Sequence, residues 1–228
     1  MRVFIDFDNT VTLGDVLSQL IKEFSINEDW RVLEDAWQGG EITTKECLTG
    51  QMKYVRIYPN EILSFLKKVK IDPYFSKLID LLREKKVEFA ILSDNFEVII
   101  KEILFYHQIS EIPIYANKLT IYRNRLLPSF PYQNPNCFSC AHCKKIHFVN
   151  EVHSLEDPII YIGDGKSDIC PAKEADIVLA KDVLLKYFRK NELPCIEFRN
   201  LAKVYDYLNE GLLGWCPSKE LSLVKGLK

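Results

Sequence analysis

Residues 3–10 read Val-Phe-Ile-Asp-Phe-Asp-Asn-Thr, a short apolar run that ends in two acids one residue apart. The apolar run predicts a buried β-strand. Because side chains alternate along a strand, Asp6 and Asp8 are expected on the same side of the chain. Two buried carboxylates need a cation between them or a shared proton, and hard divalent cations bind carboxylate oxygens. The octet therefore predicts a metal-assisted site at the end of the first strand.

The composition describes a folded chain with no strong charge bias. It has 228 residues, of which 47% are hydrophobic, enough for a core and a smaller second module. A net charge of −2 without any basic block argues against nucleic acid as a partner. The longest apolar stretches, such as Pro158–Ile162, are too short to cross a membrane. No signal peptide is recognised, and seven cysteines are an odd number, so we expect reduced thiols and a cytoplasmic protein.

The periodicity of apolar residues divides the chain into two parts. Over residues 14–71 it is helical throughout, with no strand pattern. Beyond this insertion, helical stretches alternate with strand patterns such as Val87–Leu92 and Ile159–Ile162. That alternation predicts an α/β fold, a parallel sheet with helices on its faces. We therefore expect one core, formed by residues 1–13 and 72–228, interrupted by a helical insertion over residues 14–71.

Polar side chains follow three of the predicted strands. Asp6, Ser93 and Asp164 each come just after an apolar strand pattern, and Asp168 lies four residues beyond Asp164. In parallel sheets the functional groups lie beyond the carboxyl ends of the strands, so these loops are expected to converge. A lysine at position 144 or 145 adds a positive charge.

This set of side chains suits the transfer of a phosphoryl group. One carboxylate attacks phosphorus, and a second protonates the leaving oxygen and later activates water. Magnesium held by carboxylates neutralises charge and orients the substrate. Hydroxyls and a lysine hold the remaining phosphate oxygens.

The same segments resemble, in order, the four motifs of the haloacid dehalogenase (HAD) superfamily. They are Asp6-Phe-Asp8-Asn-Thr10, Ser93 after a strand, a lysine, and Gly163-Asp164-Gly165-Lys-Ser-Asp168. The resemblance covers about residues 1–210. It implies a HAD-like, Rossmann-like parallel sheet core in which residues 14–71 form a small α-helical cap.

The resemblance also implies roles for the acids. Asp6 would be the nucleophile and Asp8 the general acid and base. Mg²⁺ would be bound by Asp6, the backbone carbonyl of Asp8 and Asp164, with Asp168 supporting these metal ligands. The predicted activity is that of a magnesium-dependent phosphatase, which hydrolyses a small phosphorylated metabolite through an aspartyl-phosphate.

Three residues are predicted to bind the substrate phosphate. Ser93 and a lysine follow from the resemblance, and Thr10 is a further candidate whose alternative role is to cap its own loop. In the family the lysine opens a helix with apolar residues three, four and seven positions later. Counted from Lys145 these positions hold Phe, Val and Val, whereas from Lys144 they hold His, Phe and Glu. We therefore predict Lys145.

Within the superfamily, the chain is most similar to the phosphoserine-phosphatase-like branch. The stretch Ile114-Tyr-Ala-Asn117 and the cysteine-rich segment before the lysine resemble methionine-salvage phosphatases, which act on 2-hydroxy-3-keto-5-methylthiopentenyl-1-phosphate. The alternatives are a phosphoserine, phosphocholine or phosphoethanolamine phosphatase, a phosphoryl transferase, or a non-catalytic metal-stabilised binding module on the same fold.

The segment Cys137-x2-Cys140-x2-Cys143 has three interpretations. With His142 or His147 it has the residue types of a structural zinc site. It also resembles the beginning of an iron–sulfur run, or it is a loop of small packed thiols.

In the helical insertion, the aromatic residues Trp30, Trp37 and Tyr54 either line a substrate pocket or pack as core. Asp15 either reaches the mouth of the site or begins the first helix of the insertion.

Overall fold

A single mixed sheet forms the centre of the molecule. The computed structural model describes residues 1–134, 136, 140–144, 146–150 and 158–212. Within this part, seven strands form one sheet in the order β4-β3-β2-β1-β5-β6-β7. The strands are β1 (Arg2–Ile5), β2 (Glu88–Phe96), β3 (Ile114–Tyr122), β4 (Arg125–Ser129), β5 (Ile159–Gly163), β6 (Ile177–Ala180) and β7 (Ile196–Glu197). The predicted α/β class is confirmed.

The predicted first strand lies in the middle of the sheet. β1 pairs in parallel with β2 on one side and with β5 on the other. All four of its residues are buried, which explains the continuous apolar pattern, because a central parallel strand is covered on both faces. Among the strands of the described residues, only β4 runs antiparallel, and a turn in which Arg123 has a φ of 58° joins it to β3.

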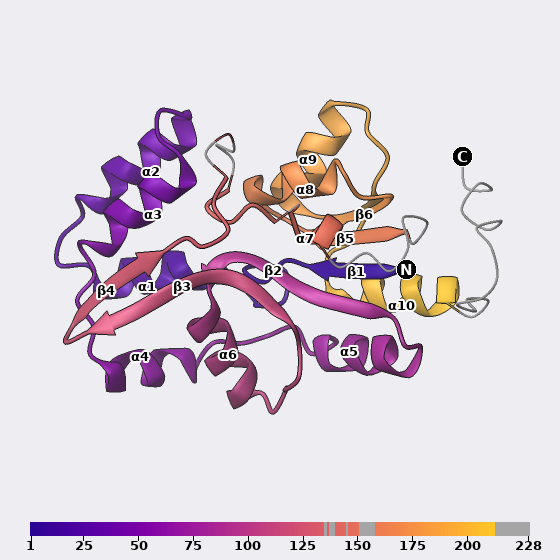
Figure 1. The fold of residues 1–228 in the computed structure, drawn as a ribbon, viewed down its shortest axis with the longest axis horizontal. Helices are drawn as coiled ribbons and strands as arrows, with labels where there is room; N and C mark the ends of the chain where they lie inside the picture. Colours follow the sequence, from indigo (N-terminus) through magenta and orange to yellow (C-terminus); the bar gives the residue numbers. More distant parts are fainter. Residues whose placement is uncertain (135, 137–139, 145, 151–157, 213–228) are drawn as a thin grey trace.

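Helices cover both faces of the sheet (Figure 1). Val3 and Ile5 of β1 face one apolar cluster, shared with α5, α6 and α10. Phe4 faces a second cluster, shared with α7, α8 and α9. These helices are α5 (Phe75–Glu84), α6 (Glu97–Tyr106), α7 (Ile146–Asn150), α8 (Ile169–Ala172), α9 (Asp182–Lys190) and α10 (Leu201–Leu212). No helix in the described residues is long and apolar enough to cross a membrane.

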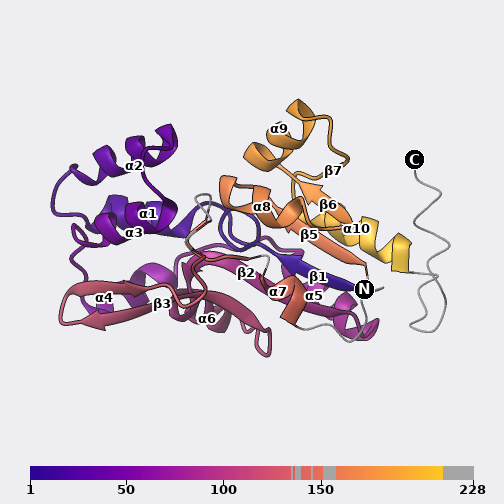
Figure 2. The ribbon, with the colours of Figure 1, turned by 45° about the horizontal axis from the view of Figure 1, so that its top comes forward.

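The predicted helical insertion consists of α1 (Val16–Phe24), α2 (Trp30–Gly39), α3 (Thr44–Met52) and α4 (Pro59–Leu66). The chain enters and leaves it side by side, because Thr12 and Ile71 form an antiparallel bridge. Figures 1 and 2 show α1, α2 and α3 grouped beyond the carboxyl ends of β1 and β2, whereas α4 lies against α6. The helical insertion therefore places three helices over the edge of the sheet where the acids were expected.

Candidate active site

The register of the sheet brings the predicted loops together. Ile5 at the end of β1 is aligned with Ile91 of β2 and with Ile162 of β5. Asp6, Ser93 and Asp164 follow these aligned residues by one or two positions. The three loops therefore meet at one edge of the sheet, as the sequence predicts.

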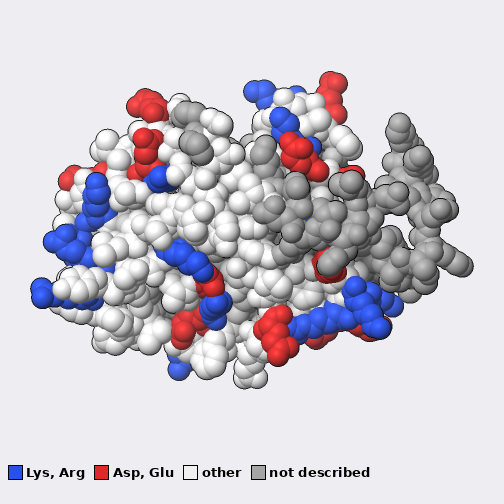
Figure 3. Space-filling view, viewed as in Figure 1, with Lys and Arg blue, Asp and Glu red and all other residues white. Residues whose placement is uncertain are grey.

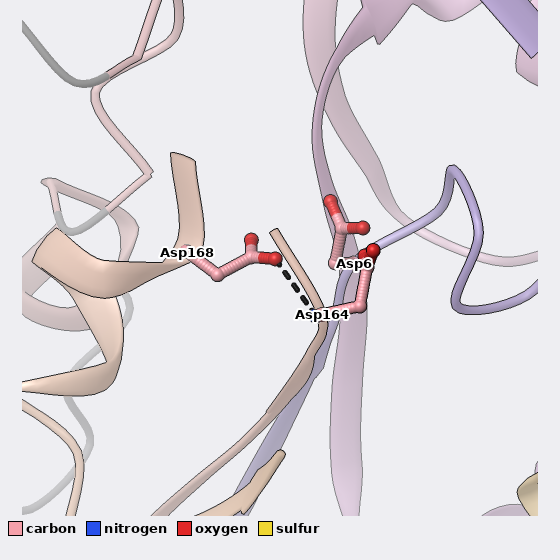
Figure 4. Close-up of side chains that lie close together, drawn as sticks. All are labelled: Asp6, Asp164 and Asp168. Carbon is pink, nitrogen blue, oxygen red and sulfur yellow. Dashed lines mark hydrogen bonds between the residues drawn. The ribbon is translucent and has the colours of Figure 1, made fainter. Parts of the chain in front are cut away.

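Three carboxylates form the centre of the site. Oxygen atoms of Asp6, Asp164 and Asp168 lie within 4.8 Å of one another. Figure 4 shows Asp6 and Asp164 side by side, from the ends of β1 and β5, with the carboxylate of Asp168 turned toward them. All three side chains are buried. Among the described residues, this is the group that could hold a metal ion.

The raised pKa values of these acids favour a bound cation at this position. Burial, and then the neighbouring Asp168, raise the pKa of Asp6 well above its usual range. Burial and Asp168 also raise the pKa of Asp164 to about 6. One lysine does not balance three carboxylates, and a divalent cation would restore their ionised form.

Four hydrogen bonds hold the Asp168 carboxylate in place. Its Oδ1 accepts hydrogen bonds from Lys144 Nζ (2.6 Å) and Tyr161 Oη (2.6 Å). Its Oδ2 accepts from the backbone N–H groups of Asp164 (3.0 Å) and Gly165 (2.8 Å). The carboxylate therefore fixes the loop that carries Asp164, an arrangement that suits the predicted supporting role.

The lysine that the structure places in the site is Lys144. Its side chain is fully buried, and Nζ lies 2.7 Å from Asp6 Oδ1 and 3.2 Å from Ser167 Oγ. Burial alone would lower the pKa of Lys144, but Asp168 and Asp6 more than offset this and hold the pKa well above its usual value. The predicted Lys145 lies outside the described residues. Lys145 was predicted because the lysine was expected to be the first residue of a helix. In the structure, α7 begins at Ile146, two residues after Lys144.

Asp8 is prepared to donate a proton. Its Oδ1 accepts a hydrogen bond from the Val16 N–H (2.8 Å), and its Oδ2 accepts from Asn95 Nδ2 (2.8 Å). Burial, and then the nearby Asp15, raise the pKa of Asp8 to about 8. The raised pKa favours the protonated form of Asp8, the form that the predicted general acid needs. Asn95 was not among the predicted site residues, although its position near the end of β2, two residues after Ser93, is a usable signal.

The two predicted hydroxyls have different surroundings. Ser93 is buried, lines the cavity, and accepts a hydrogen bond from the Asn95 N–H (3.1 Å) through Oγ. Thr10 instead donates from Oγ1 to Asp164 Oδ1 (3.1 Å) and is absent from the residues that line the cavity. Asn9 Nδ2 donates to the other oxygen of Asp164 (2.7 Å). In this structure Thr10 therefore orients a carboxylate, because the turn after β1 directs its side chain toward β5.

A cavity of about 260 Å³ opens onto these residues. Helices α1, α2 and α3 supply its far wall, which includes Asp15 and Trp37. Asp15 also caps α1, accepting a hydrogen bond from the Ser18 N–H (2.7 Å), so both interpretations of this residue hold. Trp30 is a core residue, and Tyr54 packs against the same core.

Asp94 joins two parts of the site that the sequence did not connect. Its carboxylate accepts hydrogen bonds from the backbone N–H groups of Ala141 (3.0 Å) and His142 (2.8 Å). Lys144 follows two residues later. The end of β2 therefore fixes the segment that delivers the buried lysine, a contact made across 47 residues of sequence that no local pattern predicts.

The described part of the cysteine-rich segment contains no converging metal ligands. Cys140 and Cys143 are buried, and Cys137 lies outside the described residues. The Nε2 atoms of His142 and His147 are 2.8 Å apart and share a hydrogen bond. Among the described residues, no group of cysteines and histidines has the geometry of a metal site.

This histidine pair predicts a loss of stability in acid. Burial lowers the pKa of His142 to about 2 and that of His147 to about 4, whereas unfolded histidines titrate near about 6.5. Below that pH the unfolded chain binds protons that the folded chain excludes, so stability falls as pH falls. His147→Phe should make urea unfolding less pH-dependent between about pH 6.5 and 4, by about 1.4 kcal/mol per pH unit. Parallel curves for the two proteins would contradict neutral burial of His147.

Comparison with known proteins agrees with this geometry. The model of the family described as "Putative Phosphatase" matches residues 1–191. The chain belongs to this family. This match confirms the predicted phosphatase family, and the fold shared with phosphoserine phosphatase confirms the predicted HAD-like core.

Relatives of this phosphatase family member include two named enzymes. It is 28% identical over 214 residues to the 2-hydroxy-3-keto-5-methylthiopentenyl-1-phosphate phosphatase of Bacillus pumilus, covering 91% of this chain and 92% of the relative. It is 26% identical over 228 residues to the polyol phosphate phosphatase PYP1 of Saccharomyces cerevisiae, covering 93% and 94%. A substrate-bound phosphoserine phosphatase shares the fold, with a TM-score of 0.66 at 18% identity over 90% of this chain and 97% of that one.

Proposed function

We propose that this protein is a magnesium-dependent phosphatase that hydrolyses a small phosphate monoester through an aspartyl-phosphate on Asp6. The observation that carries the proposal is the group of Asp6, Asp164 and Asp168, two of which pair with the buried Lys144 ammonium, at a cavity that Asp8 also lines. Membership of the phosphatase family supports it.

The reaction needs two displacements at phosphorus. In the first, an Asp6 oxygen attacks phosphorus, the ester P–O bond breaks, and Asp8 gives its proton to the leaving alcohol oxygen. In the second, water attacks the phosphorus of the aspartyl-phosphate and Asp8 takes the proton back. The bond to Asp6 then breaks and inorganic phosphate is released.

The other residues hold the phosphate and the ion. Lys144 and Ser93 would bind phosphate oxygens, in place of the predicted set with Lys145 and Thr10. Asp6, the backbone carbonyl of Asp8 and Asp164 would hold Mg²⁺, which neutralises negative charge and orients the phosphate. Asp168 and Thr10 position the acids, through the hydrogen bonds to the Asp164 backbone and side chain.

The helical insertion would act as a cap over the substrate. Residues of the insertion, 14–71, supply one wall of the cavity. Residues of the core, proposed as 1–13 and 72–228, supply the other wall. A cap that excludes bulk water protects the aspartyl-phosphate until the intended water attacks. The substrates of the relatives, a methylthiopentenyl phosphate and polyol phosphates, are the first candidates for this chain.

Free thiols and surface charges bear on the location of the protein and on its type of partner. Cys47 and Cys195 are thiols outside any disulfide, which supports the proposed cytoplasmic location. On the face in Figure 3, basic and acidic side chains are interspersed, as expected of a partner that is a small molecule rather than nucleic acid.

Removal of metal tests the proposed function. Hydrolysis of p-nitrophenyl phosphate should fall at least about 100-fold in excess chelator, because the acids of the site lose the cation that keeps them ionised. Addition of Mg²⁺ in excess of chelator should restore the rate. The circular dichroism spectrum, measured in parallel, controls for unfolding. Undiminished hydrolysis in chelator would contradict the magnesium requirement.

A further inference from the structure

A second cavity lies at the same end of the sheet as the acids. Its volume is about 370 Å³, and it lies beyond the carboxyl ends of β6 and β7, the two strands that follow β5 in the sheet (Figure 2). It shares no lining residue with the cavity of the candidate active site. Ligands of parallel α/β sheets bind beyond the carboxyl ends of the strands. The second cavity is therefore in a position where folds of this class bind ligands.

Four basic side chains from three segments of the chain line this second cavity. Lys181 follows β6, Arg199 follows the end of β7, and Lys186 and Arg189 belong to α9. Residues three positions apart are neighbours on the surface of a helix, so Lys186 and Arg189 can face the same ligand. We call the cavity lined by these four residues the basic pocket.

The two acids that line the basic pocket do not balance its four cations. Glu197 Oε2 pairs with Arg189 Nη2 (2.6 Å). Asp182 Oδ2 accepts a hydrogen bond from Asn9 Nδ2 (3.1 Å), an amide of the loop after β1. In the part of the chain that the structure describes, the other three basic side chains of the pocket make no ion pair. The excess of positive charge favours an anionic ligand.

Two buried apolar residues complete the lining of the basic pocket. Leu185 is 8% exposed and Phe198 is 2% exposed. Lys181 Nζ lies 5.6 Å from the centroid of the Phe198 ring, and the Phe198 N–H donates to the Ala180 carbonyl oxygen (3.1 Å). These contacts fix the ends of β6 and β7 relative to each other. Apolar surface beside the cations also excludes water from part of the pocket, which strengthens their attraction for an anion.

We propose that the basic pocket binds a small polyanion that carries a diphosphate group. A single phosphate can contact only some of the four cations, whereas a diphosphate can reach cations on more than one segment. Lysine and arginine form charge-assisted hydrogen bonds with phosphate oxygens. Binding at this pocket does not depend on the proposed phosphatase activity, because the two cavities have separate linings.

Titration calorimetry with pyrophosphate and with ADP tests this binding. The full chain is titrated at low salt, with chelator present so that Mg²⁺ does not hold the probe at the acids of the candidate active site. At least one probe should bind with a Kd below about 1 mM, and a tenfold increase in salt should weaken the binding at least about threefold. Binding of ADP at least about threefold tighter than pyrophosphate would identify the ligand as a nucleotide. Equal or tighter binding of pyrophosphate would identify it as free diphosphate.

Two double variants locate the bound probe. Lys186→Gln with Arg199→Gln removes two charges from exposed positions of the basic pocket and should weaken binding at least about tenfold. Lys173→Gln with Lys190→Gln removes two charges from exposed positions outside the pocket and should change the Kd by less than about threefold. Neither double variant should alter the hydrolysis of p-nitrophenyl phosphate, because none of these residues lines the candidate active site.

The outcomes separate this inference from the proposed function. Absence of saturable binding of both probes would overturn the inference, and so would equal binding by the variant of the basic pocket. Binding that survives in this variant but is lost in Lys144→Met would assign the polyanion to the candidate active site and would also overturn it. Failure to hydrolyse p-nitrophenyl phosphate with Mg²⁺ would contradict only the proposed phosphatase function, because the binding is measured without Mg²⁺.

Discussion

Asp6→Asn is expected to reduce kcat for p-nitrophenyl phosphate by at least about 10⁴-fold, because an amide does not attack phosphorus. The substitution keeps the shape of the side chain and an oxygen that accepts the hydrogen bond from Lys144 Nζ. Asp6 is buried among other acids, so the loss of its charge should change the free energy of unfolding little.

A matched control separates this effect from a general effect of removing an acid. Asp80 lies on α5 at an exposed position, away from the cavity. Asp80→Asn should therefore keep full activity. Steady-state kinetics and urea unfolding of both variants check the prediction. Substantial activity in folded Asp6→Asn would show that Asp6 is not the nucleophile.

Lys144→Met should lower both activity and stability. The lysine pairs with Asp6 Oδ1 (2.7 Å) and Asp168 Oδ1 (2.6 Å) and has no exposed surface. Its removal leaves two buried carboxylates without their cation, a change that should reduce the free energy of unfolding by about 3 kcal/mol at pH 7. Activity should fall at least about 100-fold, because a phosphate-binding charge is lost.

Lys145→Met is the matched variant for this prediction. It removes the same charge from the adjacent position, so it tests directly which lysine belongs to the site. We expect kcat within about threefold of the unmodified protein, since Lys144 already supplies the buried ammonium. Urea unfolding and phosphatase kinetics decide between the two. Loss of activity in Lys145→Met with full activity in Lys144→Met would contradict the assignment.

The sequence predicted the parts of the fold that depend on local patterns. The apolar run before Asp6 is a central buried strand, and the helical periodicity of residues 14–71 appears as α1 to α4. These elements were predictable because burial imposes a period of two or of 3.6 residues on the chain. The packing of α4 against α6 of the core was not predictable in this way, because it depends on contacts between distant segments.

The site was predictable to the extent that strand ends determine it. Asp6, Ser93 and Asp164 converge because β1, β2 and β5 are parallel neighbours. The lysine and Thr10 were not determined in this way. Lys144 lies before its helix and is delivered through the contact of Asp94 with a distant loop, and Thr10 turns toward Asp164. Both depend on side-chain directions in irregular segments, which residue spacing does not specify.

In the proposed mechanism, the phosphoryl group is transferred first to Asp6 and then to water. The direct measurement is a rapid-quench reaction of the magnesium-loaded protein with p-nitrophenyl phosphate, followed by borohydride reduction, which converts an aspartyl-phosphate to homoserine. Mass spectrometry of the N-terminal peptide should then locate homoserine at position 6, and Asp6→Asn should give none. Repeated turnover without homoserine at position 6, or with the modification at another acid, would contradict the proposed mechanism.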